Sequence, residues 1–170
     1  MARPTISIIA ALSENRVIGN KGRIPWHIKE DLVRLRNLTK DKVVILGRKT
    51  YESMAAYYDK SGREMPAKEY IVITTNNKYQ SARNNAVVAH SFSEAINKSD
   101  EYHQPEVFII GGAQVFEEAL PITDKLYLTI VHTQADGDAF FPDYSQFSNE
   151  VHRQKSQNGS YSYTFLELTR

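Results

Sequence analysis

Short runs of apolar, often β-branched residues recur along the chain, and polar or helix-compatible segments separate them. Runs of this length with no polar side are typical of strands that are covered on both faces. They predict buried strands at residues 5–12, 42–46, 69–75, 86–89, 107–110 and 126–132. Two further strands are expected at residues 151–155 and 161–168, joined by a hairpin turn at residues 157–160.

Helical patterns fill the intervals between these runs. They predict helices at residues 28–38, 48–57, 91–98 and 113–120, and Ser91 with Glu94 forms a capping box for the third. Residues 17–22, with two glycines, and the polar residues 58–64 are expected to be loops. The alternation predicts an α/β fold with a mostly parallel sheet of about eight strands, an antiparallel C-terminal hairpin and four flanking helices.

Composition restricts the class of protein. A chain of 170 residues suits one domain, residues 1–170, and 21 Lys and Arg against 20 Asp and Glu argue against nucleic-acid or anionic-membrane binding. Without cysteine, thiolate metal sites and cysteine nucleophiles are excluded. No signal peptide or membrane-spanning run is visible, so we expect a cytoplasmic protein, and a monomer.

Asp31 is the acid that the pattern makes unusual. On the first helix it shares the apolar face of Leu35, whereas Glu30 points elsewhere and is expected to pair with Arg34 one turn on. A carboxylate on an apolar face must find a partner or have a raised pKa. This stretch alone leaves open that Asp31 only caps the helix or complements its dipole.

Three strand ends carry chemistry suited to phosphate. Gly47, Arg48, Lys49 and Thr50 lead from a buried strand into a helix, where backbone N–H groups, two cations and a hydroxyl meet. The other two strand ends carry a Gly-Gly pair at 111–112 and two hydroxyls at 74–75. Each feature alone also fits a tight turn or a solvated surface. Because ligands bind at the carboxyl ends of strands in open α/β sheets, the three strand ends should face one crevice. No Asp or Glu follows the third strand, where it would bind the ribose hydroxyls of NAD. Cations and hydroxyls suit a ribose with an extra phosphate, which favours NADP over NAD.

Other kinds of site lack their signatures. The five histidines show no metal-ligand spacing, and neither a nucleophile elbow nor a P-loop is present. We therefore expect no metal site. What remains is one buried carboxylate beside a dinucleotide-like site, which fits protonation coupled to hydride transfer.

An ordered set of motifs spanning residues 6–168 resembles the dihydrofolate reductase family. These motifs are residues 9–11, 17–19, 24–26 with 31–32, 47–53, 109–113, 126–129, 137–138 and 141–142. The resemblance implies the dihydrofolate reductase fold. It also implies NADPH-dependent reduction of 7,8-dihydrofolate to tetrahydrofolate, with antifolates as inhibitors. It implies that Asp31 holds the pterin amide edge and 2-amino group, that Thr129 joins it through water, and that Trp26 packs nearby.

The resemblance also assigns the binding residues. The substrate would be bound by Ile9, Leu32, Leu35, Met54, Met65, Lys68 and Ile110. The cofactor would be bound by Ala11, Ile18, Gly19, Asn20, Gly47, Arg48, Lys49, Thr50, Ser53, Thr74, Thr75, Gly111, Gly112, Ala113, Gln114 and Val115. Residues 17–24 would form a mobile loop over the nicotinamide, and a cis peptide would join Gly111 to Gly112.

Some residues depart from the family pattern. Lys68 stands where an arginine usually binds the folate glutamate, and Arg63, in a long loop at residues 57–65, is the alternative. Phe116 replaces a common tyrosine, and Gln114 an arginine. Two other functions compete: a reductase of the same fold in riboflavin synthesis and a non-catalytic nucleotide-binding protein. The stretch 25–31 argues against the first, and Asp31 with three phosphate features argues against the second.

Overall fold

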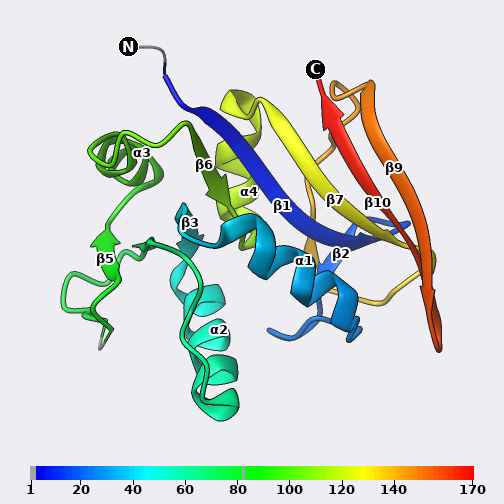
Figure 1. Ribbon diagram of the computed structural model, residues 1–170, viewed down its shortest axis with the longest axis horizontal. Coiled ribbons are helices and arrows are strands. Elements are labelled where there is room, and N and C mark those ends of the chain that lie inside the picture. Colours follow the sequence, from blue (N-terminus) through cyan, green and yellow to red (C-terminus); the bar gives the residue numbers. More distant parts are fainter. Residues whose placement is uncertain (1–2, 82) are drawn as a thin grey trace.

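One eight-stranded sheet carries the fold in the computed structural model, which describes residues 3–81 and 83–170 (Figure 1). In spatial order its strands are β5 (Ala86–Ala89), β4 (Glu69–Ile73), β3 (Val43–Gly47), β6 (Glu106–Ile109), β1 (Thr5–Ser13), β7 (Lys125–Val131), β10 (Tyr161–Thr169) and β9 (Asn149–Asn158). The first six run parallel, while β10 pairs antiparallel with both β7 and β9. The predicted mostly parallel sheet with an antiparallel C-terminal hairpin is confirmed.

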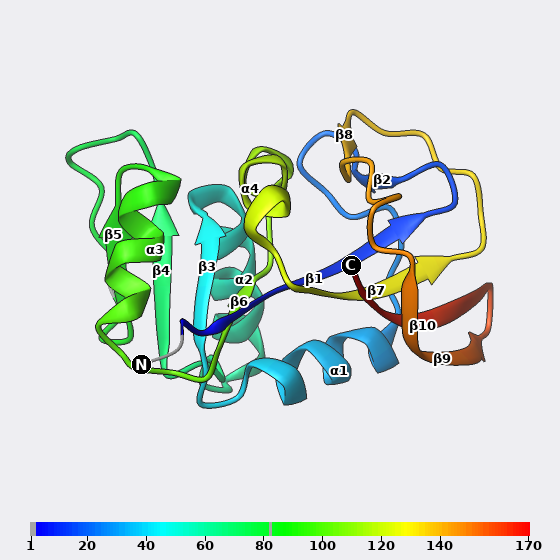
Figure 2. The ribbon, with the colours of Figure 1, turned by 90° about the horizontal axis from the view of Figure 1, so that it is seen from above.

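Two hydrophobic cores lie on opposite faces of the sheet. Successive side chains of β1 alternate between them, so that Ile8 faces one core and Ile9 the other. Figure 2 shows helices on opposite sides of the sheet. The Ile8 side is covered by α3 (Phe92–Asp100) and α4 (Ala113–Ala119), and the Ile9 side by α1 (Lys29–Thr39) and α2 (Arg48–Ser61). Half of the expected capping box of α3 is present, because Ser91 Oγ accepts the Glu94 N–H at 3.0 Å, whereas the Glu94 carboxylate accepts the His90 N–H at 2.6 Å in place of the Ser91 N–H.

A small second sheet forms where the sequence predicted a loop. β2 (Val17–Gly19) pairs antiparallel with β8 (Ala139–Phe140), more than one hundred residues away along the chain. The Asp138 N–H donates to Gly19 O at 3.1 Å, and the Asp138 carboxylate accepts the Lys21 N–H at 3.2 Å. Because the pairing is non-local, the pattern of residues 17–22 could not reveal it.

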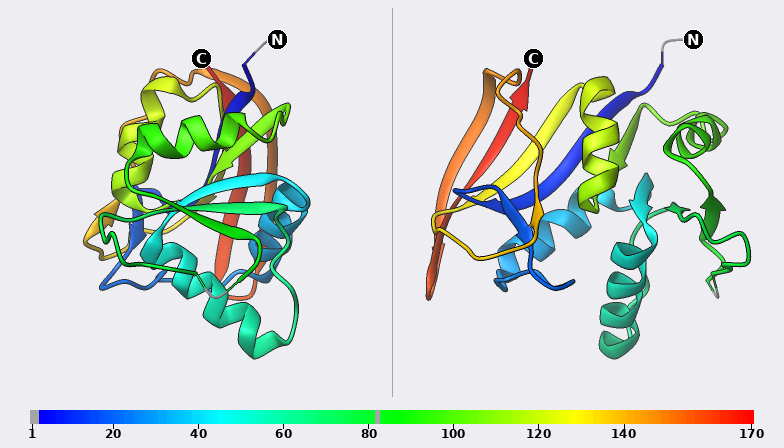
Figure 3. Two further views of the ribbon diagram at one scale, coloured as in Figure 1. Left: turned by 90° about the vertical axis from the view of Figure 1, so that its left-hand side faces the viewer. Right: turned by 180° about the vertical axis from the view of Figure 1, so that it is seen from behind.

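Helix α2 is longer than predicted. Residues 58–61 continue the helix instead of starting the expected polar loop, and Figure 3 shows α2 extending beyond the sheet. Tyr58 is buried against the core, which stabilises the added turn. Gly62 then ends the helix in the left-handed conformation (φ 71°), and its N–H donates to Tyr58 O at 3.0 Å. At the end of α4, a short 3₁₀ turn, η1 (Leu120–Ile122), follows directly.

The expected pair between Glu30 and Arg34 on α1 is wrong. The hydroxyls of Tyr163 and Ser156 donate to Glu30 Oε1 at 2.6 and 2.7 Å, and these bonds lower the pKa of Glu30. Arg34 instead turns toward Glu167 on β10. The C-terminal hairpin therefore binds Glu30 and Arg34 separately. Its contacts with Glu30 anchor the first turn of α1.

Candidate active site

Three adjoining hollows lie at the carboxyl ends of the parallel strands, where ligands bind in open α/β sheets. The first, which we call the cation cleft, has a volume of about 360 Å³. It is lined by Gly47, Arg48, Lys49, Thr50, Ile73, Thr74, Thr75, Phe92, Gly112, Ala113, Gln114, Val115 and Glu118. All three phosphate features predicted from separate strand ends thus meet in one place.

The cation cleft suits a ligand that carries phosphate. Arg48 and Lys49 open helix α2, whose first turn contains no acidic residue, so their charges add to the positive end of the helix dipole. Arg48 Nη1 is held 3.0 Å from Glu52 Oε1, while Lys49 is exposed. The cleft therefore offers an oriented cation, Arg48, and an exposed cation, Lys49, that can adjust to a ligand. Gly47 and Gly112 have no side chains, so a ligand can approach the backbone there.

Gly111 and Gly112 form the floor between β6 and α4, and a cis peptide joins them as the resemblance implied. The Gly47 N–H donates to Gly111 O at 2.8 Å, which ties two phosphate features together. Gly111 has φ +140°, and a Cβ there would lie 3.3 Å from Thr50 Oγ1. A side chain at this position would be strained and crowded, so the close approach of the two loops depends on glycine.

The second hollow, which we call the Asp31 hollow, has a volume of about 270 Å³ and mostly apolar walls. It is lined by Ala11, Ile24, Trp26, His27, Ile28, Asp31, Leu32, Leu35, Ser53, Met54, Tyr57 and Tyr58. Trp26 and Ile28 are buried in a cluster with Val131, Tyr163 and Phe165, so they form a fixed wall. A flat, partly aromatic ligand fits such walls.

Asp31 is the acid in this hollow. Its Oδ1 accepts a hydrogen bond of 2.5 Å from Thr129 Oγ1, a side chain that is only 1% exposed. The contact is direct, which corrects the expectation that water joins the two residues. Burial raises the pKa of the Asp31 carboxyl, and the hydrogen bond from Thr129 and the charge of Arg34 oppose that rise. Asp31 is therefore a half-buried acid bonded to a buried hydroxyl, and it does not cap α1, whose N-cap is Ile28.

The third hollow, which we call the bridging hollow, connects the other two. It has a volume of about 180 Å³ and is lined by Ile9, Ala10, Ala11, Ile18, Ile24, Asp31, Leu32, Leu35, Thr50, Ile110, Gly111, Gly112 and Phe116. It shares Asp31 and Leu32 with the Asp31 hollow, and Thr50 and Gly112 with the cation cleft. A cofactor held by the cation cleft can thus extend to a substrate held beside Asp31.

Comparison with known proteins agrees with this geometry. A family model described as dihydrofolate reductase matches residues 5–170. The chain belongs to the dihydrofolate reductase family. It is 36% identical to the dihydrofolate reductase type 3 of Salmonella typhimurium, with 97% of this chain and 98% of that protein covered. It is also 36% identical to a dihydrofolate reductase of Haemophilus influenzae, with 98% and 99% covered.

A solved structure supports the same assignment. Dihydrofolate reductase from Enterococcus faecalis, complexed with NADP(H) and RAB-propyl, has a TM-score of 0.83 against this chain. The two are 31% identical, and 99% of this chain and 97% of that one are covered. The dihydrofolate reductase fold predicted from the motifs is confirmed.

Some residues assigned from the family pattern lie apart from the three hollows. Met65 is buried in the core beside α2, and Lys68 is exposed and directly precedes β4. Gly19 and Asn20 lie in the segment that Asp138 holds, without lining a hollow. Ser53, assigned to the cofactor, lines the Asp31 hollow.

Other lining residues escaped the sequence analysis. Tyr57 and Tyr58 form one wall of the Asp31 hollow, and their rings meet edge to face at 5.5 Å between centroids. Neither was assigned to the site individually, because both were expected in the loop of residues 57–65 and not on the last turns of α2. Ile24, which is 64% exposed, lines both the Asp31 hollow and the bridging hollow.

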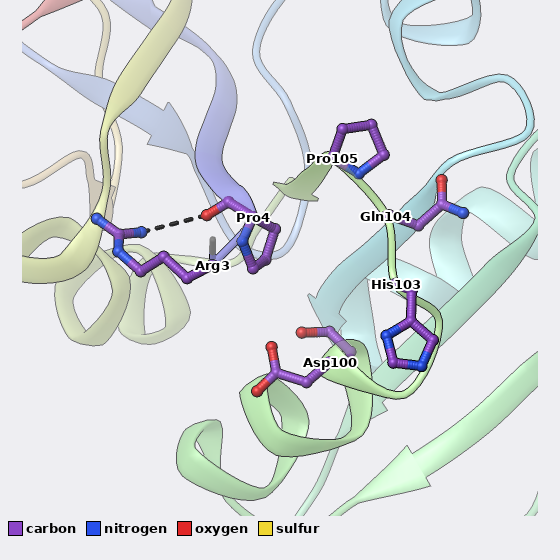
Figure 4. Close-up of a pocket in the computed structure, with 7 residues that line it drawn as sticks. Arg3, Pro4, Asp100, His103, Gln104 and Pro105 are labelled. Carbon is purple, nitrogen blue, oxygen red and sulfur yellow. Dashed lines mark hydrogen bonds between the residues drawn. The ribbon is translucent and has the colours of Figure 1, made fainter. Parts of the chain in front are cut away.

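A larger hollow, of about 580 Å³, lies at the opposite edge of the sheet (Figure 4). It is bordered by Arg3 and Pro4 at the start of the chain and by Asp100 and His103 after α3. The Arg3 guanidinium already binds Asp124, at 2.7 and 2.9 Å. This edge holds the amino ends of the parallel strands, so its volume does not make it the active site of the family.

Two kinds of feature are absent from residues 3–81 and 83–170. No group of three His, Cys, Asp or Glu side chains is placed to hold a metal ion. In the same residues, no helix has the length and hydropathy to cross a bilayer.

Proposed function

We propose that this chain catalyses the NADPH-dependent reduction of 7,8-dihydrofolate to 5,6,7,8-tetrahydrofolate and so supports one-carbon and thymidylate metabolism. The observation that carries the proposal is the continuity of the three hollows. Asp31, a carboxylate whose pKa is raised by burial, lines both the Asp31 hollow and the bridging hollow that leads to the cation cleft. Membership of the dihydrofolate reductase family supports it.

Asp31 acts on the pterin ring. Its carboxylate accepts hydrogen bonds from the amide edge and the 2-amino group, while Thr129 holds its Oδ1 in place. It favours the form of the pterin that takes a proton at N5, and the proton comes from water. Bound NADPH supplies the hydride for C6. Trp26 and Leu32 keep the walls of the hollow apolar, which excludes bulk water from the reacting face.

The residues around the cation cleft fit NADPH. Arg48, Lys49 and the start of α2 bind phosphate, and Thr74 and Thr75 take the adenosine end. Ala11, Ile18 and Ile110 border the bridging hollow and would hold the nicotinamide ring there. Residues 17–24 would cover the bound ring, and the contacts of Asp138 with Gly19 and Lys21 hold this segment in place.

We propose Lys68 as the residue that binds the folate glutamate, with Arg63 as the alternative. Both are exposed, and both lie in the segment that links α2 to β4. We further propose that residues 1–170 act as one monomeric domain that also binds antifolates. A cytoplasmic location is proposed too, since a chain without cysteine suits a reducing compartment.

The purified chain is assayed by oxidation of NADPH in the presence of dihydrofolate, with NADH as the matched cofactor control. The expected result is oxidation that requires dihydrofolate and is faster with NADPH than with NADH. Oxidation that requires a ribosylaminopyrimidine instead would identify the riboflavin-pathway reductase. Binding of NADPH without oxidation in either assay would indicate a nucleotide-binding protein.

A further inference from the structure

A cation lies under the active-site helix in addition to those of the cation cleft. Arg34 follows Asp31 by three residues on α1, so the two side chains lie on neighbouring positions of one helix face. The Arg34 side chain is only 17% exposed and lies between the helix and the sheet. The proposed reaction uses Asp31 but gives Arg34 no role, although burying a guanidinium has a large desolvation cost.

Aromatic rings and a backbone carbonyl hold the Arg34 guanidinium in place. Its central carbon is 4.6 Å from the ring centroid of Phe165 and 5.9 Å from that of Tyr127. Its Nη1 donates to Leu128 O at 3.4 Å. Leu128 precedes Thr129, the residue that donates to Asp31, so Arg34 is held to the same strand, β7, that supplies the donor to Asp31.

Glu167 supplies the counter-charge on the other side. Its Oε2 is 3.8 Å from Arg34 Nη2, and its Oε1 is 2.9 Å from Lys125 Nζ. Lys125 also lies 4.5 Å from the Tyr127 ring centroid, and the Tyr127 hydroxyl donates to Glu106 at 3.1 Å. A chain of charged and polar groups therefore runs under α1 and ends at Arg34, three residues after Asp31 on the same helix.

The electrostatic effects on the two ends of this chain are reciprocal. Burial lowers the pKa of Arg34, whereas Glu167 and Asp31 raise it. Burial raises the pKa of Asp31, whereas Thr129 and Arg34 lower it. Because an arginine stays charged over the working pH range, its effect on Asp31 is a constant field.

Other titratable groups around this pair come from every element that packs against it. They are His27 before α1, Glu30 on α1, Tyr57 and Tyr58 on α2, Glu106 on β6, Lys125 and Tyr127 on β7, and Tyr163 and Glu167 on β10. Glu30 is an anion that raises the pKa of Asp31, so it acts against Arg34. Lys125 is already bound by Glu167, which leaves Arg34 as the cation whose charge lowers the pKa of Asp31.

We propose that Arg34 is a positioning residue that acts through Asp31: its charge, balanced by Glu167, sets the pH range in which the reductase works. This inference rests on the proposed function. Removing Arg34 leaves Asp31 with less stabilisation of its anionic form, so the carboxyl keeps its proton to a higher pH. Removing the charge of Glu167 has the opposite effect, because the positive field of Arg34 is then less compensated.

Four variants separate this role from a structural one. Arg34→Met removes the charge and keeps much of the packing, and Arg34→Lys restores the charge without the planar group. Glu167→Gln removes the counter-charge. Arg153→Met is the matched control, because Arg153 is an exposed cation on β9, paired with Glu150 at 2.7 Å.

The readout that does not depend on activity is the ¹³C carboxyl resonance of Asp31, titrated in the ligand-free protein and assigned with Asp31→Asn. We expect Arg34→Met to raise the titration midpoint by about half a pH unit or more and Glu167→Gln to lower it by a similar amount. Arg34→Lys should recover at least half of the shift, and Arg153→Met should leave the midpoint unchanged. The pH profile of single-turnover NADPH oxidation with dihydrofolate should move in the same directions.

Equal midpoints in all variants, or shifts of the same sign in Arg34→Met and Glu167→Gln, would overturn the inference. If Arg34→Met does not fold, Glu167→Gln still tests the inference, because its titration midpoint for Asp31 should be lower than that of the wild type. A wild-type protein that shows these titration shifts without dihydrofolate-dependent oxidation would contradict the proposed function alone. A wild-type reductase without the shifts would contradict only the role of Arg34.

Discussion

Replacing Thr129 with valine tests whether its hydroxyl stabilises the charged form of Asp31. Thr129→Val keeps the shape of the side chain and removes the donor of the 2.5 Å hydrogen bond to Asp31 Oδ1. A hydrogen bond to an ionised group contributes about 1.5–3 kcal/mol. At about 1.4 kcal/mol for each pKa unit, the pH profile of single-turnover hydride transfer should move upward by about one to two units.

The same substitution predicts a pH-dependent loss of stability. Above the pKa of Asp31 the full charged hydrogen bond is lost, and for 170 residues this lowers Tm by about 3–12 °C. Below that pKa the carboxyl is neutral, so the substitution removes a neutral hydrogen bond. The free energy of unfolding then falls by only about 1 kcal/mol. Because Thr129→Val raises the folded-state pKa further, the folded protein retains a proton that the unfolded chain releases, so stability falls as pH rises through this range.

Thr123→Val is the matched control for this prediction. Thr123 is also 1% exposed, and its hydroxyl donates to Ala119 O at 2.8 Å, a partner that does not titrate. Its loss of Tm should be the same from about pH 4 to about pH 9, with no shift of the kinetic profile. Parallel losses in Thr129→Val and Thr123→Val at every pH would refute the reasoning.

Three further substitutions test the substrate and loop contacts. Lys68→Ala should raise KM for dihydrofolate more than it lowers kcat, measured by steady-state kinetics beside Arg63→Ala. Tyr57→Ala removes a ring that is 52% exposed on the wall of the Asp31 hollow, and it should raise KM for dihydrofolate about two- to tenfold with kcat unchanged. Gly137→Ala would place a Cβ closer than 3.0 Å to the Val17 side chain; it should lower the free energy of unfolding by about 1–3 kcal/mol, measured with denaturant, and raise KM for NADPH.

The contrary results are specific for each substitution. If Lys68→Ala leaves KM for dihydrofolate unchanged and Arg63→Ala raises it, then Arg63 binds the folate glutamate. A fall in kcat at constant KM for Tyr57→Ala would show that its ring acts on the chemical step. Unchanged unfolding and NADPH kinetics for Gly137→Ala would show that residues 17–24 are not held through this glycine.

The sequence predicted best those elements that depend on local pattern. Residues 43–46 are fully buried on both sides of β3, so a continuous apolar run sufficed to place the strand within one residue. The glycines, cations and hydroxyls at three strand ends likewise predicted the cation cleft. Asp31 was distinguished from Glu30 by helical periodicity alone, and the structure places Asp31 in a hollow and Glu30 beside the hairpin.

The errors share a physical cause, which is contact with residues far away in the chain. Glu30 was assigned to Arg34 because helical spacing allowed it, but the C-terminal hairpin brings the Tyr163 and Ser156 hydroxyls to Glu30 and the Glu167 carboxylate to Arg34. The strand at Val17 depends on pairing with Phe140. The role of Arg34 is invisible in the sequence for the same reason, since its partners lie on β7 and β10.

Asp31 is the residue on which the proposed reaction depends, and the rate of Asp31→Asn tests that dependence most directly. NADPH oxidation with dihydrofolate is compared at neutral pH between the wild-type protein and Asp31→Asn, which keeps the shape of the side chain and removes its charge. The wild type should oxidise NADPH only when dihydrofolate is present, and Asp31→Asn should lose about 100-fold or more of that rate. No dihydrofolate-dependent oxidation by the wild type, or equal rates in the two proteins, would contradict the account.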